Sequence, residues 1–124
     1  MKTLVIGAST NPDRYAYKAV SLLKSKQHEV IPLGVKLGEI EGVPIVTEKH
    51  TFSTIHTISL YVGPSRQEEY LDYMISLQPQ RVIFNPGTEN EGIEKALEEK
   101  GIYTERACTL VLLSTNQYES NKGN

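Results

Sequence analysis

The chain has 124 residues, a formal net charge of −2 and one cysteine, Cys108. This length fits one domain with its own apolar core. The slightly negative charge argues against a general nucleic-acid binder, because such proteins need a basic surface. A single cysteine excludes an internal disulfide, and the sequence shows neither a signal peptide nor an apolar run long enough to cross a membrane. We therefore expect a cytoplasmic protein.

In the first half of the chain, short apolar runs alternate with helical patterns. Residues 3–7 form a fully apolar run, which is typical of a strand buried on both faces. Apolar residues recur at helical spacing over 15–27, which predicts a helix there. A second strand is expected at 28–33. Residues 35–46 contain glycine and proline and are expected to be a loop with one short extended piece.

The second half of the chain continues the same alternation. The expected elements are a strand at 56–62, a helix at 65–78, a strand at 81–85, a helix at 88–101 and a fifth short strand within 102–113. Ser65 and Glu68 have the spacing of a capping box, which predicts the start of the first of these helices. For the apolar residues at the end of 102–113, the sequence pattern does not assign a type of secondary structure.

Strands that alternate with helices imply βαβ units and a parallel sheet. We predict an α/β, Rossmann-like three-layer sandwich with a mostly parallel five-stranded sheet in the order 3-2-1-4-5. Residues 1–118 would form this single domain, and 119–124 a polar C-terminal tail. Ligands of such sheets bind beyond the carboxyl ends of the strands. The loops that follow Gly7, Leu33, Val62 and Asn85 should therefore border one crevice.

The first of these loops does not have the pattern of a dinucleotide site. Counting from Gly7, Ser9 and Pro12 occupy the places where that fingerprint has its second and third glycines. The end of the second strand also lacks the acidic residue that binds the ribose of NAD. A Walker loop is excluded because no Gly-Lys-Ser/Thr follows.

The same loop does have the properties of an anion cradle. Gly7, Ala8 and Ser9 are small, so a phosphate can approach the backbone amides, and the next helix directs its positive end at the crevice. Arg14 and Lys18 lie near the start of that helix. A tight βα turn with solvated charges would have the same sequence. We favour the cradle because loops at this edge of such sheets usually bind ligands.

The other loops add weaker signals. Lys36 follows the second strand and has the reach to contact a phosphate, although most surface lysines are only solvated. Gly63 and Pro64 end the third main strand, and Asn85, Pro86 and Gly87 end the fourth. Each pattern also suits a compact turn.

The segment VIGASTNPDRY at 5–15, the later pieces EGVPIV and YVGPS, and the final ACTLVLL resemble the small stand-alone coenzyme A-binding domain proteins (YccU-like). That family is similar to the N-terminal domain of the succinyl-CoA synthetase α subunit. The resemblance covers residues 2–118, and the pattern Gly-Ala-Ser-x-Asn-Pro-x-Arg is its most specific part. The chain departs from the family where Gly34-Val35-Lys36 replaces Asn-Pro-Lys, and where Ala107 separates Arg106 from Cys108.

The resemblance implies a Rossmann-like domain that binds coenzyme A or an acyl-CoA as a non-catalytic module. The predicted ligand-binding residues are Gly7, Ala8, Ser9, Asn11, Arg14, Lys18, Gly34, Lys36, Val62, Gly63, Pro64, Asn85, Pro86 and Gly87. The first three would cradle the phosphates, and Arg14 and Lys36 would offer positive charge to them.

No catalytic set is visible, because the three histidines are scattered and none has metal-ligand spacing. Cys108 lies among apolar residues and is interpreted as a small buried side chain.

Two alternative functions stay open: a nicotinamide-dependent reductase, and an interaction domain with a vestigial ligand site. We expect no partner among nucleic acids, membranes or metals. A homodimer or a partner subunit remains open, because Tyr70 and Tyr73 would suit a partner surface.

Overall fold

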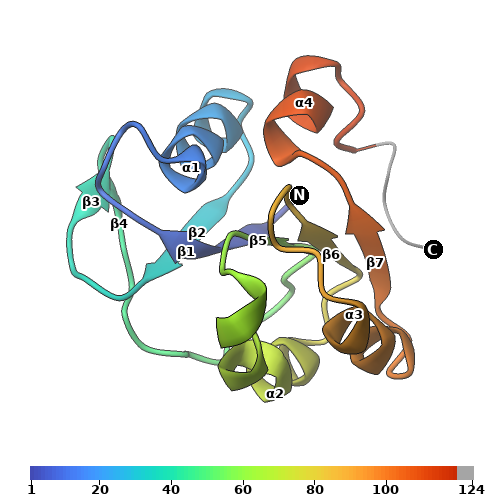
Figure 1. Cartoon of the computed structure of the whole chain (residues 1–124). Helices are drawn as coiled ribbons and strands as arrows, with labels where there is room; N and C mark the ends of the chain where they lie inside the picture. Colours follow the sequence, from blue (N-terminus) through green and yellow to red (C-terminus); the bar gives the residue numbers. More distant parts are fainter. Residues whose placement is uncertain (120–124) are drawn as a thin grey trace.

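The computed structural model describes residues 1–119, so the predicted tail at 119–124 lies outside the described residues except for Glu119. Along the chain (Figure 1) the elements of the first half are β1 (Thr3–Ala8), α1 (Tyr15–Ser25), β2 (Val30–Gly34), β3 (Glu39–Ile40) and β4 (Val43–Pro44). Those of the second half are β5 (Thr57–Leu60), the 3₁₀ helix η1 (Pro64–Arg66), α2 (Glu68–Leu77), β6 (Arg81–Phe84), α3 (Glu91–Glu98), β7 (Tyr103–Arg106) and α4 (Thr109–Ser114). The expected alternation of strands and helices is confirmed.

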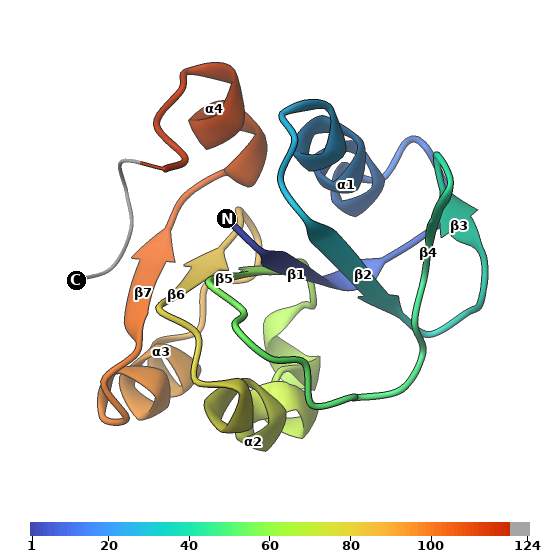
Figure 2. The same cartoon turned by 180° about the vertical axis from the view of Figure 1, so that it is seen from behind.

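A five-stranded parallel sheet forms the middle layer. Figure 1 and Figure 2 show α1 and α4 on one face of this sheet and α2 and α3 on the other. Successive side chains of a strand point to opposite faces, so β1 contributes to two cores. Leu4 and Ile6 pack toward α2 and α3, whereas Val5 packs toward α1 and α4. The strands are apolar without alternation because both faces are covered. The predicted Rossmann-like sandwich is thereby confirmed.

The order of the strands corrects one part of the prediction. The predicted order 3-2-1-4-5 places the strand at 56–62 beside the strand at 28–33. In the structure the order is β2-β1-β5-β6-β7, so β5 pairs with β1 instead. The outer edge of β2 is met by the loop that follows the β3–β4 hairpin, where Val46 forms a single parallel bridge with Leu33. The predicted order puts the strand at 56–62 on this edge of β2. In the structure the edge is occupied instead by the end of the short extended piece predicted within 35–46.

This order determines where a ligand can bind. β2 lies on one side of β1, and β5, β6 and β7 follow on the other, so the winding reverses between β1 and β5. At such a switch point the loops at the carboxyl ends diverge and leave a crevice. The loops after Ala8 and Leu60 are the two that border it.

The start of the helix after β5 also differs from expectation. Ser65 and Glu68 form no capping box, because neither η1 nor α2 has a side-chain cap. Pro64 begins the tight 3₁₀ turn instead, and α2 starts two residues after it ends. As a result α2 buries Tyr70 and Tyr73. Both are only 9% exposed, so their proposed role on a partner surface is wrong.

Candidate functional site

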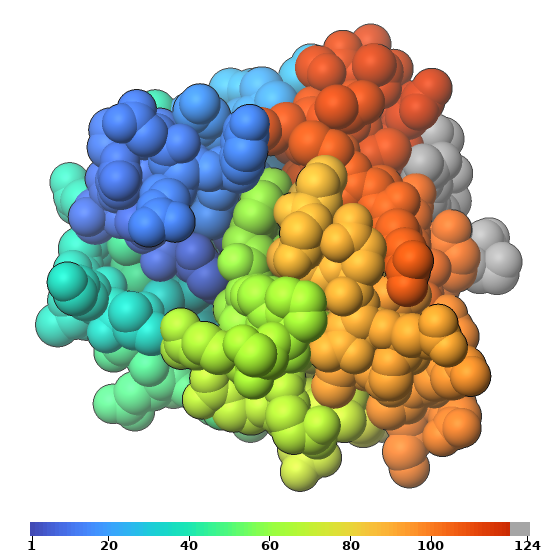
Figure 3. Space-filling view, in the orientation of Figure 1, coloured from blue at the N-terminus to red at the C-terminus, as the bar shows by residue number. Residues whose placement is uncertain are grey.

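A cleft of about 650 Å³ opens at the carboxyl ends of the strands, at the switch point between β1 and β5. In the space-filling view of Figure 3 the surface is hollowed between the blue N-terminal segment and the green segment that carries η1. The residues that line the cleft are Gly7, Ala8, Ser9, Asp13, Arg14, Tyr15, Ala16, Gly34, Val35, Tyr61, Val62, Gly63, Arg66, Tyr70, Pro86, Gly87 and Thr88. This volume is in the range of ordinary small-molecule sites.

The glycines at the strand ends let these backbones approach one another. A Cβ on Gly7 would lie 3.1 Å from the backbone carbonyl carbon and oxygen of Tyr61, and a Cβ on Gly34 would lie 2.4 Å from the carbonyl oxygen of Ala8. Gly63 differs, because a Cβ there would meet no atom within 4 Å. Gly7 and Gly34 are therefore required by packing, whereas Gly63 leaves open space on the wall of the cleft.

The first loop is held by its own hydrogen bonds. The Asn11 backbone N–H donates to the Ser9 hydroxyl oxygen at 3.1 Å, and the Asp13 N–H donates to Asn11 Oδ1 at 2.9 Å. The Ser9 hydroxyl therefore accepts within the loop, and its own hydrogen remains available to a ligand. Asn11 shapes the loop rather than lining the cleft.

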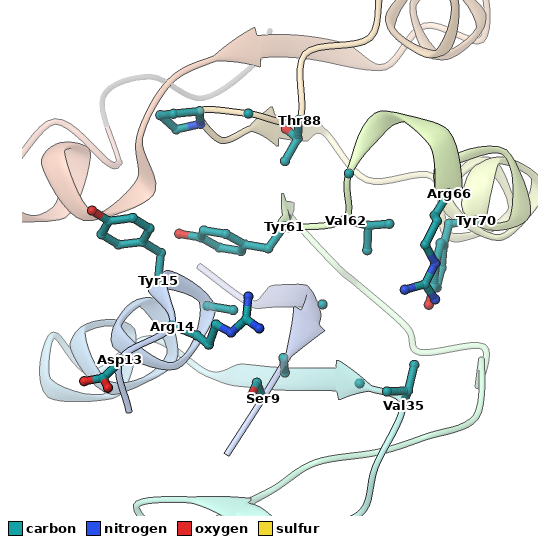
Figure 4. Close-up of a pocket in the computed structure, with 17 residues that line it drawn as sticks. Ser9, Asp13, Arg14, Tyr15, Val35, Tyr61, Val62, Arg66, Tyr70 and Thr88 are labelled. Carbon is teal, nitrogen blue, oxygen red and sulfur yellow. The ribbon is translucent and has the colours of Figure 1, made fainter. Parts of the chain in front are cut away.

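The beginning of α1 gives this end of the cleft a positive character. Arg14 precedes the helix, no side chain caps the helix N-terminus, and its first turn has no acidic residue. The N–H groups of that first turn and the helix dipole both favour an anion here. In Figure 4 the Arg14 guanidinium points into the cleft between Ser9 and Tyr61.

The opposite wall comes from the segment after β5. Val62 is buried at the base of this wall, and Arg66 and Tyr70 lie side by side further along it (Figure 4). Arg14 and Arg66 are the two basic residues of the lining, and Asp13 is the acidic one. In Figure 4 the Asp13 carboxylate points away from the space between the arginines, so that space is basic.

Tyr61 connects the two walls. Its hydroxyl is buried, and the nearby Ser59 and Thr109 hydroxyls partly offset the effect of burial on its pKa. Burial raises the pKa of Tyr61 to about 12. The phenol therefore keeps its proton at neutral pH, and the ring presents an apolar surface to the cleft.

Nine of the predicted ligand-binding residues line the cleft: Gly7, Ala8, Ser9, Arg14, Gly34, Val62, Gly63, Pro86 and Gly87. The other five do not. Asn11 is one of them, as described above. The Lys18 ammonium lies 5.4 Å from the centre of the Tyr15 ring, and Lys36 is exposed on the loop between β2 and β3. Pro64 begins η1 beside the cleft.

Asn85 is the predicted residue with the clearest structural role. It is 1% exposed, and its side-chain amide donates to the Ser59 hydroxyl and to the Leu60 carbonyl, both at 3.0 Å. Its Oδ1 accepts from the Thr109 N–H at 2.8 Å. Asn85 therefore connects β5, β6 and the start of α4, and it does not line the cleft.

Sequence reasoning missed part of the site. The lining residues absent from the prediction are Asp13, Tyr15, Ala16, Val35, Tyr61, Arg66, Tyr70 and Thr88. Arg66 had a usable signal, since it follows the third loop within one turn of a helix start. Tyr70 had no such signal, because only the packed structure shows that the buried face of α2 is the one with Tyr70, Tyr73, Met74 and Leu77.

Three further features of the described residues concern metal ions, the cysteine and a membrane. No group of three His, Cys, Asp or Glu side chains in 1–119 is placed to hold a metal ion. Cys108 is half-buried directly before α4 and is not a lining residue. In this range of the chain no helix is both long and apolar enough to cross a membrane.

A parallel α/β sheet with a basic cleft at its switch point defines a Rossmann-like domain, a fold in which ligands generally bind at that point. The chain belongs to the CoA binding domain family, whose profile matches residues 1–114. This confirms the family resemblance seen in the sequence. Comparison with curated proteins gave no match.

Solved structures agree with this assignment. An uncharacterized protein of known crystal structure is 47% identical, with a TM-score of 0.91 over 94% of this chain and 96% of that one. A conserved hypothetical protein from Pyrococcus furiosus is 28% identical, with a TM-score of 0.78 over 89% of this chain and 97% of that one. An acetyl-coenzyme A synthetase from Ca. Korarchaeum cryptofilum shares the fold at 16% identity, with a TM-score of 0.69 over 83% of this chain and 25% of the synthetase.

Proposed function

We propose that the protein binds coenzyme A or an acyl-CoA in the cleft between β1 and β5, as a non-catalytic binding or regulatory module. The observation that carries this proposal is the uncapped start of α1, which faces the cleft together with Arg14 in a member of the CoA binding domain family. A ligand with several phosphates suits such a site, because backbone N–H groups and a guanidinium both bind phosphate oxygens.

Under this proposal, different cleft residues would contact different parts of coenzyme A. Ser9, Arg14 and the first turn of α1 would hold phosphate groups. The open wall at Gly63, with Val62 behind it, would accommodate the pantetheine chain. Coenzyme A, when bound, supplies a thiol that carries acyl groups.

A nicotinamide-dependent reductase is the second candidate, and the same site argues against it. β2 ends at Gly34 and is followed by Val35, so an acidic side chain for the ribose hydroxyls is missing from this position. Ser9 lies where a dinucleotide loop needs its second glycine. An interaction domain with a vestigial site is the third candidate, and it predicts no binding of either ligand class.

Catalysis is not part of the proposal. The lining has no histidine, cysteine or lysine, and burial raises the pKa of both Tyr61 and Tyr70. A phenol with a raised pKa is a poor general base at neutral pH. Incubation with acetyl-CoA should release free thiol no faster than buffer does, and a release that is lost in Ser9→Trp would contradict this part.

Calorimetric titration tests the binding itself. We expect micromolar binding of coenzyme A, roughly −8 kcal/mol, and none of NAD or NADP. Ser9→Trp should abolish binding by filling the cradle, whereas Ser114→Trp, on the exposed end of α4, should leave it unchanged. Thermal unfolding of both variants verifies that they fold. Binding of NAD in place of coenzyme A would support the reductase, and no binding at all would support the vestigial site.

A further inference from the structure

Arg66 places a second positive charge in the cleft, away from the start of α1. It is the last residue of η1, and its side chain is 59% exposed. In Figure 4 the Arg14 and Arg66 guanidinium groups approach the same space from opposite walls. Two separated cations on facing walls match a ligand that carries two separated anionic groups.

The neighbouring Tyr70 adds a hydrogen-bond donor to this position. The residue is only 9% exposed, so its ring is buried. Tyr70 lines the cleft beside Arg66 (Figure 4). Burial raises the pKa of Tyr70, so its phenol keeps a proton that it can donate to an anion.

The ion pair of Arg66 leaves it available to a ligand. Its Nε lies 3.4 Å from a Glu69 carboxylate oxygen, and the Glu69 side chain is 53% exposed. Pairs between exposed side chains contribute little free energy, because water screens them and both side chains lose freedom. A guanidinium also has five N–H donors, so one contact with Glu69 does not exhaust it.

Lys49 is a further positive charge next to Tyr70, but it lies outside the lining of the cleft. Its ammonium lies 4.7 Å from the centre of the Tyr70 ring and donates to the backbone carbonyl of Glu69 at 2.6 Å. Lys49 therefore provides a matched control, since its removal takes the same charge from the same neighbourhood and leaves every lining residue in place.

We propose that Arg66 and Tyr70 form a second anion subsite, which binds an anionic group of the ligand other than the one held at Arg14 and the start of α1. The identity of the ligand rests on the proposed function. In a coenzyme A compound this second group has two sources: the ribose 3′-phosphate, or a carboxylate at the end of the acyl group. Both chemistries suit a guanidinium with a neighbouring hydroxyl.

Calorimetry with paired ligands distinguishes the two sources. The ligands are coenzyme A, dephospho-coenzyme A, succinyl-CoA and butyryl-CoA, and the variants are Arg66→Ala, Arg66→Lys, Tyr70→Phe and Lys49→Ala. We expect Arg66→Ala to weaken the ligand with the second anion by about tenfold to a hundredfold, and Arg66→Lys and Tyr70→Phe to weaken it less. Lys49→Ala should change affinity by less than about threefold, as expected for a charge outside the contact.

The pattern across ligands decides the outcome. If Arg66→Ala weakens coenzyme A but not dephospho-coenzyme A, the subsite binds the 3′-phosphate. If it weakens succinyl-CoA but not butyryl-CoA, the subsite binds the acyl carboxylate. An equal effect on all four ligands, no effect on any, or an effect matched by Lys49→Ala would overturn the subsite.

Failure of the proposed function is detected separately. If none of the four ligands binds the unaltered protein, the proposed function fails. The subsite is then tested with adenosine 3′,5′-bisphosphate against AMP. Tighter binding of the bisphosphate that Arg66→Ala removes would support a two-anion site for another ligand, and equal or absent binding would overturn it.

Discussion

Gly7 at the end of β1 and Tyr61 after β5 lie so close that a Cβ on Gly7 would be 3.1 Å from the Tyr61 carbonyl carbon. Gly7 also has a φ of +101°, a backbone conformation that residues with a side chain rarely adopt. The Tyr61 N–H donates to the Ile6 carbonyl at 2.8 Å, so the two strand ends are joined at this point. The contact holds the first loop against the opposite wall of the cleft.

Substitution of Gly7 by alanine should therefore disturb both stability and binding. We expect Gly7→Ala to lower the free energy of unfolding by about 1–3 kcal/mol, since the new methyl group adds a steric conflict to an unfavourable φ. Binding of coenzyme A should weaken as well, because the first loop moves away from β5. Urea unfolding and calorimetry measure the two effects.

Gly63→Ala is the matched control. Gly63 has a φ of −61°, and a Cβ there meets open space, so we expect stability to be unchanged or slightly higher. If both variants lost the same free energy of unfolding, the contact between Gly7 and Tyr61 would not be the cause.

Asn85 should be essential for stability although it is not a cleft residue. Asn85→Ala removes two donated hydrogen bonds and the acceptor of the Thr109 N–H, and it leaves buried partners unpaired. We expect a loss of about 3 kcal/mol in the free energy of unfolding. The folded fraction should bind coenzyme A with nearly unchanged affinity, as calorimetry at low temperature can show.

Asn11→Ala is the comparison for this effect. Asn11 is exposed, and its side chain accepts one hydrogen bond, from the Asp13 N–H. We expect a loss of less than about 1 kcal/mol. A strong loss of ligand affinity in Asn85→Ala, with stability intact, would instead return Asn85 to the binding site.

The sequence predicted the fold class because the information for it is local. Leu4, Val5 and Ile6 are adjacent and apolar, which indicates a strand covered on both faces. The order of the strands could not be predicted in the same way. Pairing of β5 with β1 is a contact between distant segments, and β2 presents an equally apolar run as an alternative neighbour.

In the candidate site, too, residues placed by local sequence could be predicted, whereas residues placed by long-range packing could not. Ser9 and Arg14, which were predicted as ligand-binding residues, lie in the lining of the cleft because one loop and the helix that follows it place them there. Tyr61 and Arg66, on either side of the predicted Val62 and Gly63, were missed because the Gly-Pro pattern marks only the turn itself. Asn85 has the sequence context of a loop residue, and only the packing of α4 against β5 and β6 shows that its amide is buried.

Arg14 and Lys36 give a direct test of which charge acts on the ligand. Arg14 lines the cleft, whereas Lys36 is exposed outside it. Arg14→Ala should weaken coenzyme A binding about tenfold to a hundredfold, because charge-assisted hydrogen bonds to a phosphate are lost. Lys36→Ala removes the same charge and should change affinity by less than about threefold.

The salt dependence of binding completes this test. Affinity of the unaltered protein should fall as salt rises, and the slope should be shallower in Arg14→Ala but unchanged in Lys36→Ala. If Lys36→Ala has the larger effect, the loop between β2 and β3 moves over the ligand when it binds.

His28 should make stability depend on pH. Burial, followed by the nearby N-terminal ammonium, lowers the pKa of His28 from the usual 6.5, although the carboxylate of Glu119 acts in the opposite direction. The Met1 ammonium donates to His28 Nδ1 at 2.9 Å, which requires that nitrogen to be unprotonated. Below the usual pKa the unfolded chain therefore binds a proton that the folded chain does not.

The sign of the effect follows from this difference. Stability should be fully present above about pH 6.5, and it should decrease as the pH falls through that value toward the lower pKa of the folded chain. Urea unfolding between pH 8 and pH 5 measures it. His28→Gln should flatten this slope, because the variant has no imidazole to protonate. His50→Gln, at an exposed position, should leave the slope unchanged, and a slope that persists in His28→Gln would assign the pH dependence to other groups.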